Sequence, residues 1–306
     1  MKLYEKREVL REEEAGGHGD KWLVFSGEPE LFVGEIIPKV VENSQLIPPP
    51  ESGEDGEEPP GWLLKYPQRE GCGIVAVIAR EGEEGRYLTS MYPECEGLSL
   101  PVRIESIELF PHELEARLVA LPEGLEKEIT FFDTRFLYQG KRYEDGRLYR
   151  AKLALLAYEI EAARSDPIVI DDPLQIEKYH ARLYWVEKYG IYEKSDEERA
   201  LELYRREAEI SHEPIVIPTD DMSIWIEDNP YRDEVYFQGR VEKVIDEEIE
   251  LLGARFRCYH ISILFDSDEK LLLPCYVHTE HVAKEAKFAP GEMVRGYGWV
   301  HGYVEL

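Results

Sequence analysis

The sequence predicts a mainly β protein, α+β overall, in which two β domains are related by an internal repeat and bridged by a helical hairpin. Strand-like patterns fill residues 67–165 and 231–306. Between 172 and 210 the apolar period becomes helical, and two pieces of chain 145 residues apart share one order of elements. The length of 306 residues suits two domains.

Residues 1–66 are predicted to be a lead-in to the first β domain. The stretch "DKWLVFSGEPELFVGEIIPKVV" has enough apolar side chains to pack on another element. It is followed at 48–61 by "PPPESGEDGEEPPG", which holds prolines, glycines and acids but almost no apolar residue. Such a tract cannot bury enough surface to offset the entropy lost on ordering, so we expect a flexible acidic, proline-rich loop.

The first β domain is predicted over residues 67–165. The run "CGIVAVIAR" indicates a buried strand, "RIESIELF" and "ELEARLVAL" alternate in polarity, and "EITFF" and "RLYRAKLALLAYEI" follow. Turn signals such as Glu144-Asp145-Gly146 separate these runs.

A helical connector is predicted over residues 166–230. Asp172 followed by Pro173 is typical of a helix start, and Gly190 of a helix end. Ser195 and Glu198 form a capping-box pattern that opens a second helix, expected to run to about residue 210. Apolar residues at spacings of three, four and three define one face of the first helix: Ile176, Tyr179, Leu183 and Val186.

The second β domain is predicted over residues 231–306. The runs "EVYFQGRVEKVI", "RFRCYHISILF" and "EKLLLPCYV" indicate strands, and "EHVAKEAKF" a short helix or turn. The run "EMVRGYGWVHGYVEL" indicates a closing strand or bent hairpin.

The internal repeat aligns Thr130–Tyr158 with Cys275–Tyr303 without a gap. Both copies contain a glycine turn followed by a long strand, with Gly146 matching Gly291 and Arg150 matching Arg295. The similarity predicts a duplication, although any two strand–turn–strand pieces share some of these features.

Each copy has the order strand, strand, strand, short helix, glycine turn, long strand. This order resembles the OB-fold, a five-stranded Greek-key barrel with a helix between its third and fourth strands. The resemblance covers about half the chain and implies two tandem OB-like β-barrels. The segment "GEMVRGYGWVHGY" is also similar to the ends of some uncharacterised bacterial proteins. That similarity implies no activity.

The last strand offers a candidate binding face. Strict alternation places five polar or aromatic residues on one side: Arg295, Tyr297, Trp299, His301 and Tyr303. OB-folds stack ligand rings on such residues. Alternatively, the aromatic residues pack on the helical pair or the other barrel, while valines and glycines line a small interior.

A local excess of basic residues lies between 135 and 152. The cations are Arg135, Lys141, Arg142, Arg147, Arg150 and Lys152, with Tyr138, Tyr143 and Tyr149 interleaved. Arg142, Tyr149 and Arg150 are therefore candidate contacts for a single-stranded nucleic acid or another anionic ligand. Alternatively, the cations pair with some of the 64 acidic residues of the same chain.

A weaker pattern predicts a zinc site. Thiolate and imidazole are the ligands that zinc prefers, and five such residues lie near one another in sequence: Cys258, His260, Cys275, His278 and His281. Their spacing matches no standard zinc motif. We expect all four cysteines, including Cys72 and Cys95, to be reduced and to lie in the core.

The composition bounds the function. A net charge of −28 disfavours nucleic acid and anionic membranes, and no apolar run is long enough for a membrane helix. The residues before position 15 lack the apolar core of a signal peptide. The sequence contains no G-x-S-x-G, P-loop or H-E-x-x-H motif, and no cofactor is expected.

We therefore expect a cytoplasmic, non-enzymatic binding or protein-interaction module whose partner is a protein, and the negative charge favours a basic one. One alternative is OB-type binding of single-stranded nucleic acid or another anionic ligand. The other is a zinc-binding protein or enzyme.

Overall fold

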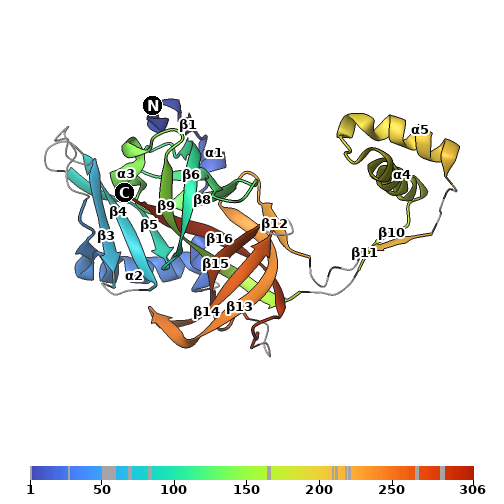
Figure 1. Cartoon of the computed structure of the whole chain (residues 1–306). Coiled ribbons are helices and arrows are strands. Elements are labelled where there is room, and N and C mark those ends of the chain that lie inside the picture. Colours follow the sequence, from blue (N-terminus) through green and yellow to red (C-terminus); the bar gives the residue numbers. More distant parts are fainter. Residues whose placement is uncertain are drawn as a thin grey trace. The chain divides into compact units, whose positions relative to one another are not determined.

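The structure is a computed structural model, and it describes residues 2–26, 28–49, 60–67, 71–81, 85–163, 167–208, 210, 213–217, 219, 222–265, 269–282 and 287–306. It is mainly β with helices, as predicted (Figure 1). Contacts divide the chain into two compact units, one of Met1–Ala163 with Ser223–Leu306 and one of Arg164–Met222. Most of the predicted acidic loop and part of the predicted helix "EHVAKEAKF" lie outside the described residues.

The larger unit is built on a ten-stranded sheet. In spatial order the strands are β1 (Glu8–Val9), β6 (Leu98–Leu109), β7 (Ala116–Pro122), β8 (Ile129–Asp133), β16 (Met293–Glu305), β9 (Leu148–Ala162), β15 (Lys270–His278), β14 (Ala254–Leu264), β13 (Glu234–Leu251) and β12 (Ile224–Glu227). Short helical turns accompany them: η1 (Leu3–Lys6), α1 (Glu12–Ala15), α3 (Phe136–Gln139) and η3 (Gly140–Arg142).

A long antiparallel ribbon of β9 and β16 lies at the centre of this sheet. At one end of the ribbon, β6 pairs with β9 and β8 pairs in parallel with β16. At the other end, β15 pairs in parallel with β9 and β13 pairs with β16. Because β7 joins β6 to β8 and β14 joins β13 to β15, the pairings form two closed rings that share the ribbon.

Around Leu155, the β9–β16 pairing is symmetric under the repeat: adding 145 to the β9 residue of a pair and subtracting 145 from its β16 partner gives a pair of the same ribbon. Leu155 pairs with Val300, and these residues are separated by the repeat offset (300 − 155 = 145). The flanking pairs, Ala154 with His301 and Leu156 with Trp299, convert into each other under that offset. The strand orders β6–β7–β8–β9 and β13–β14–β15–β16 also make corresponding pairings.

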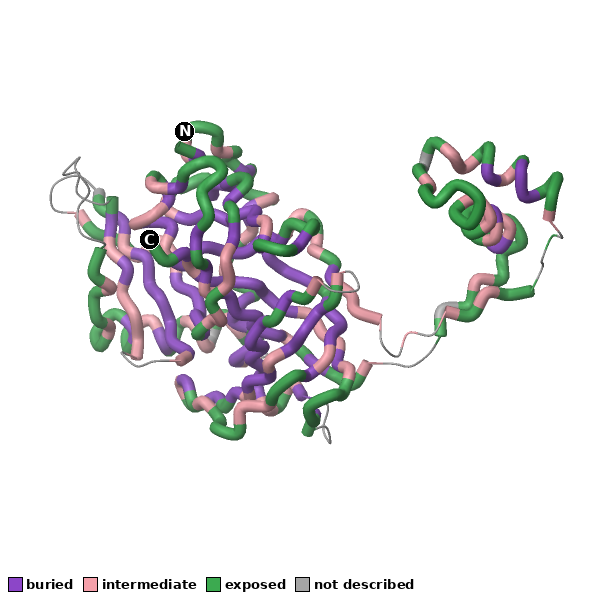
Figure 2. The backbone as a smooth tube through the Cα atoms, in the orientation of Figure 1, coloured by how far each residue is buried: buried purple, intermediate pink, exposed green. Residues whose placement is uncertain are grey.

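The two faces of the ribbon contribute to different apolar clusters. Leu155 and Val300 belong to one cluster with the side chains of both rings, whereas Leu156 and Trp299 belong to a second cluster. Figure 2 shows buried residues along the strands of the larger unit. Alternation along β9 and β16 therefore separates two cores, because successive side chains of a strand point to opposite faces.

The second core lies against a smaller sheet and the helices of the N-terminal segment. The sheet has the order β2 (Gln45–Leu46), β3 (Gly61–Tyr66), β4 (Gly73–Glu81) and β5 (Gly85–Glu94), and the helices are η2 (Asp20–Val24) and α2 (Pro29–Asn43). The strand predicted at "CGIVAVIAR" is thus β4 of this sheet, outside the two rings.

The expectation of four reduced cysteines was wrong. Cys72 and Cys95 are buried, as predicted, but they form a disulfide. The β4–β5 hairpin pairs Gly73 with Glu94, so the two flanking cysteines lie opposite each other with a Cα–Cα distance of 4.0 Å. Cys258 and Cys275 are free and buried.

The smaller unit contains the predicted helical pair. Its elements are β10 (Ile168–Ile170), α4 (Pro173–Tyr189), η4 (Lys194–Asp196), α5 (Glu197–Glu207) and β11 (Ile215–Ile217). The predicted ends of the first helix are confirmed, because the Asp172 carboxylate accepts from the Gln175 N–H at 2.8 Å and Gly190 has a φ of 80°. The predicted capping box of the second helix is not found, since Asp196 occupies the N-cap position and its side chain makes no cap bond there.

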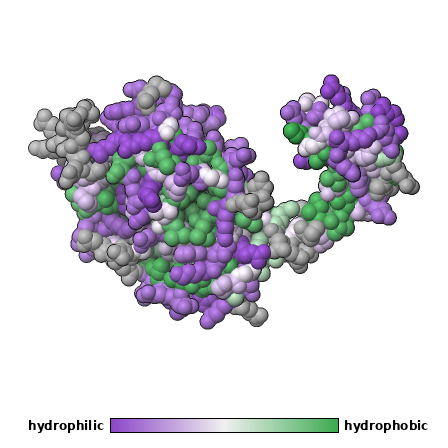
Figure 3. Space-filling view, in the orientation of Figure 1, coloured by the Kyte–Doolittle hydropathy of each residue, from purple (hydrophilic) through white to green (hydrophobic). Residues whose placement is uncertain are grey.

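The predicted packing face of α4 was mostly wrong. Ile176 is buried, but Tyr179, Leu183 and Val186 are exposed. The opposite side of the helix, with Ala181, packs against α5 around Ala200 and Tyr204. Val169 and Val216, paired between β10 and β11, are also exposed, and apolar surface covers this ribbon in Figure 3.

Candidate ligand groove

A groove of about 730 Å³ lies in the larger unit, lined by residues of η2, α2, β5 and the segment between β6 and β7. Its volume falls in the range of roughly 300–1,000 Å³ that is typical of ligand sites. The apolar side chains that line it are Trp22, Val33, Ile37, Leu88, Met91 and Phe110.

Helix α2 contributes to the groove because it has apolar residues on two faces. Ile36 and Val40, spaced by four, are buried in the second core. Val33 and Ile37, also spaced by four, line the groove and are only partly buried. Residues four apart lie on one side of a helix, so one row anchors α2 while the other remains available to a ligand.

Glu115 is the charged residue that lies deepest beside this apolar surface, with a side chain that is 3% exposed. Its Oε1 lies 3.2 Å from His18 Nε2 and accepts a hydrogen bond from the Ser90 hydroxyl. Its Oε2 lies 2.9 Å from His112 Nε2. Three segments far apart in sequence therefore meet at one carboxylate.

These neighbours keep Glu115 ionised. Burial raises the pKa of Glu115, but His18, His112 and Ser90 together outweigh burial and hold the pKa at about 2. His112 Nδ1 accepts a hydrogen bond from the Leu114 N–H, so the proton of a neutral ring lies on Nε2, facing the carboxylate. The groove consequently contains a fixed negative charge at neutral pH.

Three buried polar atoms beside the groove have no hydrogen-bond partner among the described residues: Thr89 Oγ1, His18 Nδ1 and Glu115 Oε2. The last of them lies close to His112 but outside hydrogen-bond geometry. Thr89 lies in a β-bulge, because Leu88 pairs with Ile78 and Ser90 pairs with the adjacent Val77. Bulges redirect side chains next to functional sites. Unpaired buried groups are costly, so these atoms indicate hydrogen bonds that a ligand could complete.

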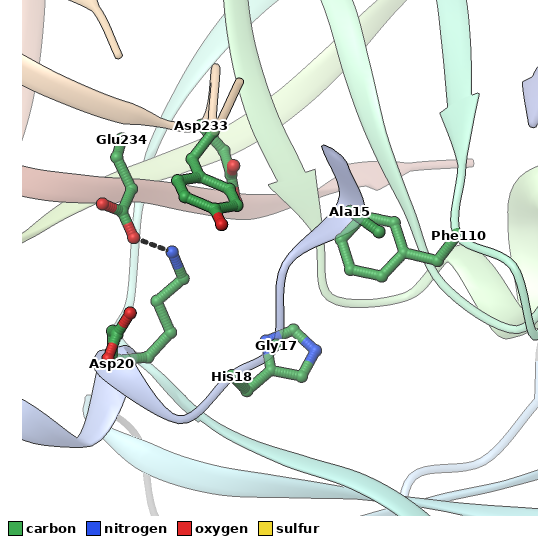
Figure 4. Close-up of a pocket in the computed structure, with 9 residues that line it drawn as sticks. Ala15, Gly17, His18, Asp20, Phe110, Asp233 and Glu234 are labelled. Atoms are coloured by element: carbon green, nitrogen blue, oxygen red, sulfur yellow. Dashed lines mark hydrogen bonds and ion pairs between the residues drawn. The ribbon is translucent and has the colours of Figure 1, made fainter. Parts of the chain in front are cut away.

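A cavity of about 30 Å³ adjoins His18 on the side of Lys21 and Glu234 (Figure 4). The Lys21 ammonium donates to Glu234, which also accepts from the Tyr158 hydroxyl at 3.1 Å and from the Tyr297 hydroxyl. A cavity of this volume holds about one water molecule. It therefore has no room for a ligand larger than a water molecule.

Asp233 and Arg117 stabilise the wall of this cavity. Asp233 accepts from the Trp299 indole N–H at 2.7 Å and from Arg117 at 3.3 Å. Burial raises the pKa of Asp233, but Lys21, Arg117 and Trp299 more than compensate, so the pKa lies below its usual value. Lys21 and Glu234 are thus paired with each other, as are Arg117 and Asp233.

The five residues predicted on the last strand do share one face of β16, the face to which Trp299 points. Most of them are buried in the second core or paired with other side chains. Trp299 and His301 are fully buried, and His301 Nε2 accepts from the Cys95 N–H at 2.8 Å. Tyr297 is bonded to Glu234, Arg295 pairs with Glu161, and Tyr303 lies beneath Arg135 and Lys152. The strand therefore presents no continuous aromatic surface to a ligand.

The structure places the predicted basic residues and their interleaved tyrosines in different environments. Tyr149 is buried and its hydroxyl accepts from the Glu144 N–H at 2.8 Å. Arg142 is half-buried and Arg150 is exposed. Several of the neighbouring cations pair with acids of the same chain: Arg135 with Glu94, Arg147 with Glu144, and Lys152 with Glu305.

The five predicted zinc ligands do not converge. Cys275 lies in the first core and Cys258 in the second, so their thiols are on opposite faces of the sheet. The rings of His278 and His281 are 5.0 Å apart, and His260 is opposite Pro274. Within the described ranges, no group of three histidine, cysteine or acidic residues is arranged to hold a metal ion.

The groove was missed by the sequence analysis, although two local signals point to it. The stretch "GGHGD" places His18 in a glycine-rich turn, and His112 precedes Glu115 by three residues.

No helix of the described structure is long and apolar enough to cross a membrane. Comparisons with protein-family models, curated proteins and solved structures found no match.

Proposed function

We propose that the chain is a non-enzymatic binding protein that holds, in the groove, a segment of a partner protein bearing apolar and basic side chains. The observation that carries this proposal is the composition of the groove lining. Apolar residues of α2 and β5 are combined with three acids, Asp20, Glu30 and Glu115, and the described lining contains no lysine or arginine. A large, mostly apolar pocket with a few convergent polar groups is the feature that most often marks a binding site.

The charges favour a basic partner over an anionic one. Asp20 and Glu30 are exposed at the groove, while Glu115 is an ionised carboxylate inside it. The whole chain carries a net charge of −28, which accelerates encounter with a basic partner and slows encounter with a polyanion. Apolar contacts with Val33 and Leu88 then supply affinity that salt does not screen.

The scaffold fits a duplicated OB-like architecture. In this proposal each ring is an OB-like barrel of five strands, with four strands from its own repeat and the fifth from the other repeat. The symmetric register around Leu155 and Val300 supports duplication, as does the short helical turn α3 between β8 and β9. The helical pair is then an addition between the repeats.

The test is a titration of the full chain with a labelled heptapeptide of alternating leucine and lysine, followed by fluorescence anisotropy. Val33→Arg places a cation in the groove and should weaken binding about tenfold or more. Val41→Arg is the matched control, because Val41 lies on the same helix, is 48% exposed and does not line the groove. Both variants change the net charge equally.

We expect Val41→Arg to bind within about twofold of the unmodified chain. A heptapeptide of alternating leucine and glutamate should bind far more weakly than the leucine–lysine peptide. Equal losses in Val33→Arg and Val41→Arg would place binding outside the groove. Failure of the unmodified chain to bind the leucine–lysine peptide would refute the proposed partner chemistry.

A further inference from the structure

Strand β5 forms one edge of the smaller sheet. In the order β2–β3–β4–β5 it has β4 as its sole strand neighbour within the described structure. The described backbone hydrogen bonds outside the strand ladders include none from residues 85–94. A strand edge of this kind carries unpaired N–H and C=O groups, which are a template for another strand.

The open part of this edge lies toward the start of β5. Arg86 and Tyr87 are exposed and Leu88, Thr89 and Ser90 are half-buried, whereas Met91–Glu94 are buried. The Thr89 bulge falls within the open part, one residue before Ser90. Bulges redirect strand pairing, so an added strand is limited here to a few residues.

The groove runs along this edge. Four consecutive residues of β5, Leu88, Thr89, Ser90 and Met91, all line it. Successive side chains point to opposite faces of a sheet, so a groove on one face would be lined by alternate residues. The Thr89 bulge locally interrupts this alternation. Because four consecutive residues line the groove, it extends along the open part of β5.

We infer that the partner segment binds in an extended conformation as an additional strand along β5, with main-chain hydrogen bonds to residues 86–90. This inference rests on the proposed function, because it concerns the segment that the groove holds. The apolar side chains of such a strand lie toward Val33 and Ile37 of α2, and its basic side chains lie near Asp20 and Glu30. Main-chain bonds provide affinity in this mode, and alternate side chains provide specificity.

The test compares the leucine–lysine heptapeptide with two N-methylated forms, one methylated at the leucines and one at the lysines. Alternate amides of a strand point to the same side, so one form loses the bonds to β5 and the other loses none. Loss of two or three main-chain bonds should weaken binding about fivefold or more.

We expect one methylated form to bind weakly and the other to bind like the parent peptide. Equal affinity of all three peptides would overturn strand addition and leave the proposed groove function intact. Equal weakening by both methylation patterns would also overturn strand addition, because binding would then not depend on which set of peptide amides is free. Absence of binding by the parent peptide would instead refute the proposed function, and strand addition with it.

Discussion

Arg117→Ala should lower the free energy of unfolding by about 3–5 kcal/mol, as expected for breaking a buried ion pair. The Arg117 side chain is 1% exposed and lies 3.1 Å from Glu108 and 3.3 Å from Asp233. It also donates to the carbonyl oxygens of Pro230 and Glu14, each at 3.0 Å. The substitution removes the cation beside two buried carboxylates and the donor to two carbonyl oxygens, in segments far apart in sequence.

The matched control is Arg232→Ala, measured beside Arg117→Ala by urea unfolding. Arg232 pairs with the same Glu108, at 2.6 Å, but its side chain is 37% exposed. Water screens such a pair, so we expect a loss of about 1 kcal/mol or less. Similar losses in both variants would contradict the inference that burial of Arg117 determines the effect.

Trp299→Ala should also lower the free energy of unfolding by about 3–5 kcal/mol. Trp299 is fully buried in the second core, stacks on His301 with ring centroids 4.6 Å apart, and donates its indole N–H to Asp233. Alanine would leave a cavity between the central ribbon and the N-terminal segment, and Asp233 would lose a donor.

Tyr236→Ala is the comparison for Trp299→Ala, because Tyr236 is an aromatic residue of the adjacent strand β13 but is 51% exposed. Its loss should change stability by about 1 kcal/mol or less. If the Trp299→Ala protein were as stable as the Tyr236→Ala protein, Trp299 would not stabilise the second core, contrary to this account.

The strands and the first helix could be predicted because their signals are local. Asp172 and Gly190 define the ends of α4 through hydrogen bonds to residues within about one turn, and Pro173 occupies the first turn, where no backbone N–H is needed. Alternation along β16 correctly separated Val300 from Trp299. Each of these features is determined by residues that are close to it in sequence, so the sequence pattern alone predicts it.

The sharing of β9 and β16 between two rings could not be predicted, since it depends on pairings between residues 145 apart, such as Leu155 with Val300. The groove is also non-local, because Glu115 meets His18 and Ser90 only after the sheets have formed. For α4, two apolar stripes compete, and the smaller Ala181 allows α5 to approach on the side that the sequence analysis did not choose.

The most direct test of groove binding is amide hydrogen exchange across the full chain, with and without saturating leucine–lysine heptapeptide. Binding in the groove should slow exchange in residues 16–22, 29–37 and 86–91 and leave β16 and α4 unchanged. Slowed exchange in β16 or in residues 135–152, with the groove segments unchanged, would contradict the groove as the binding site.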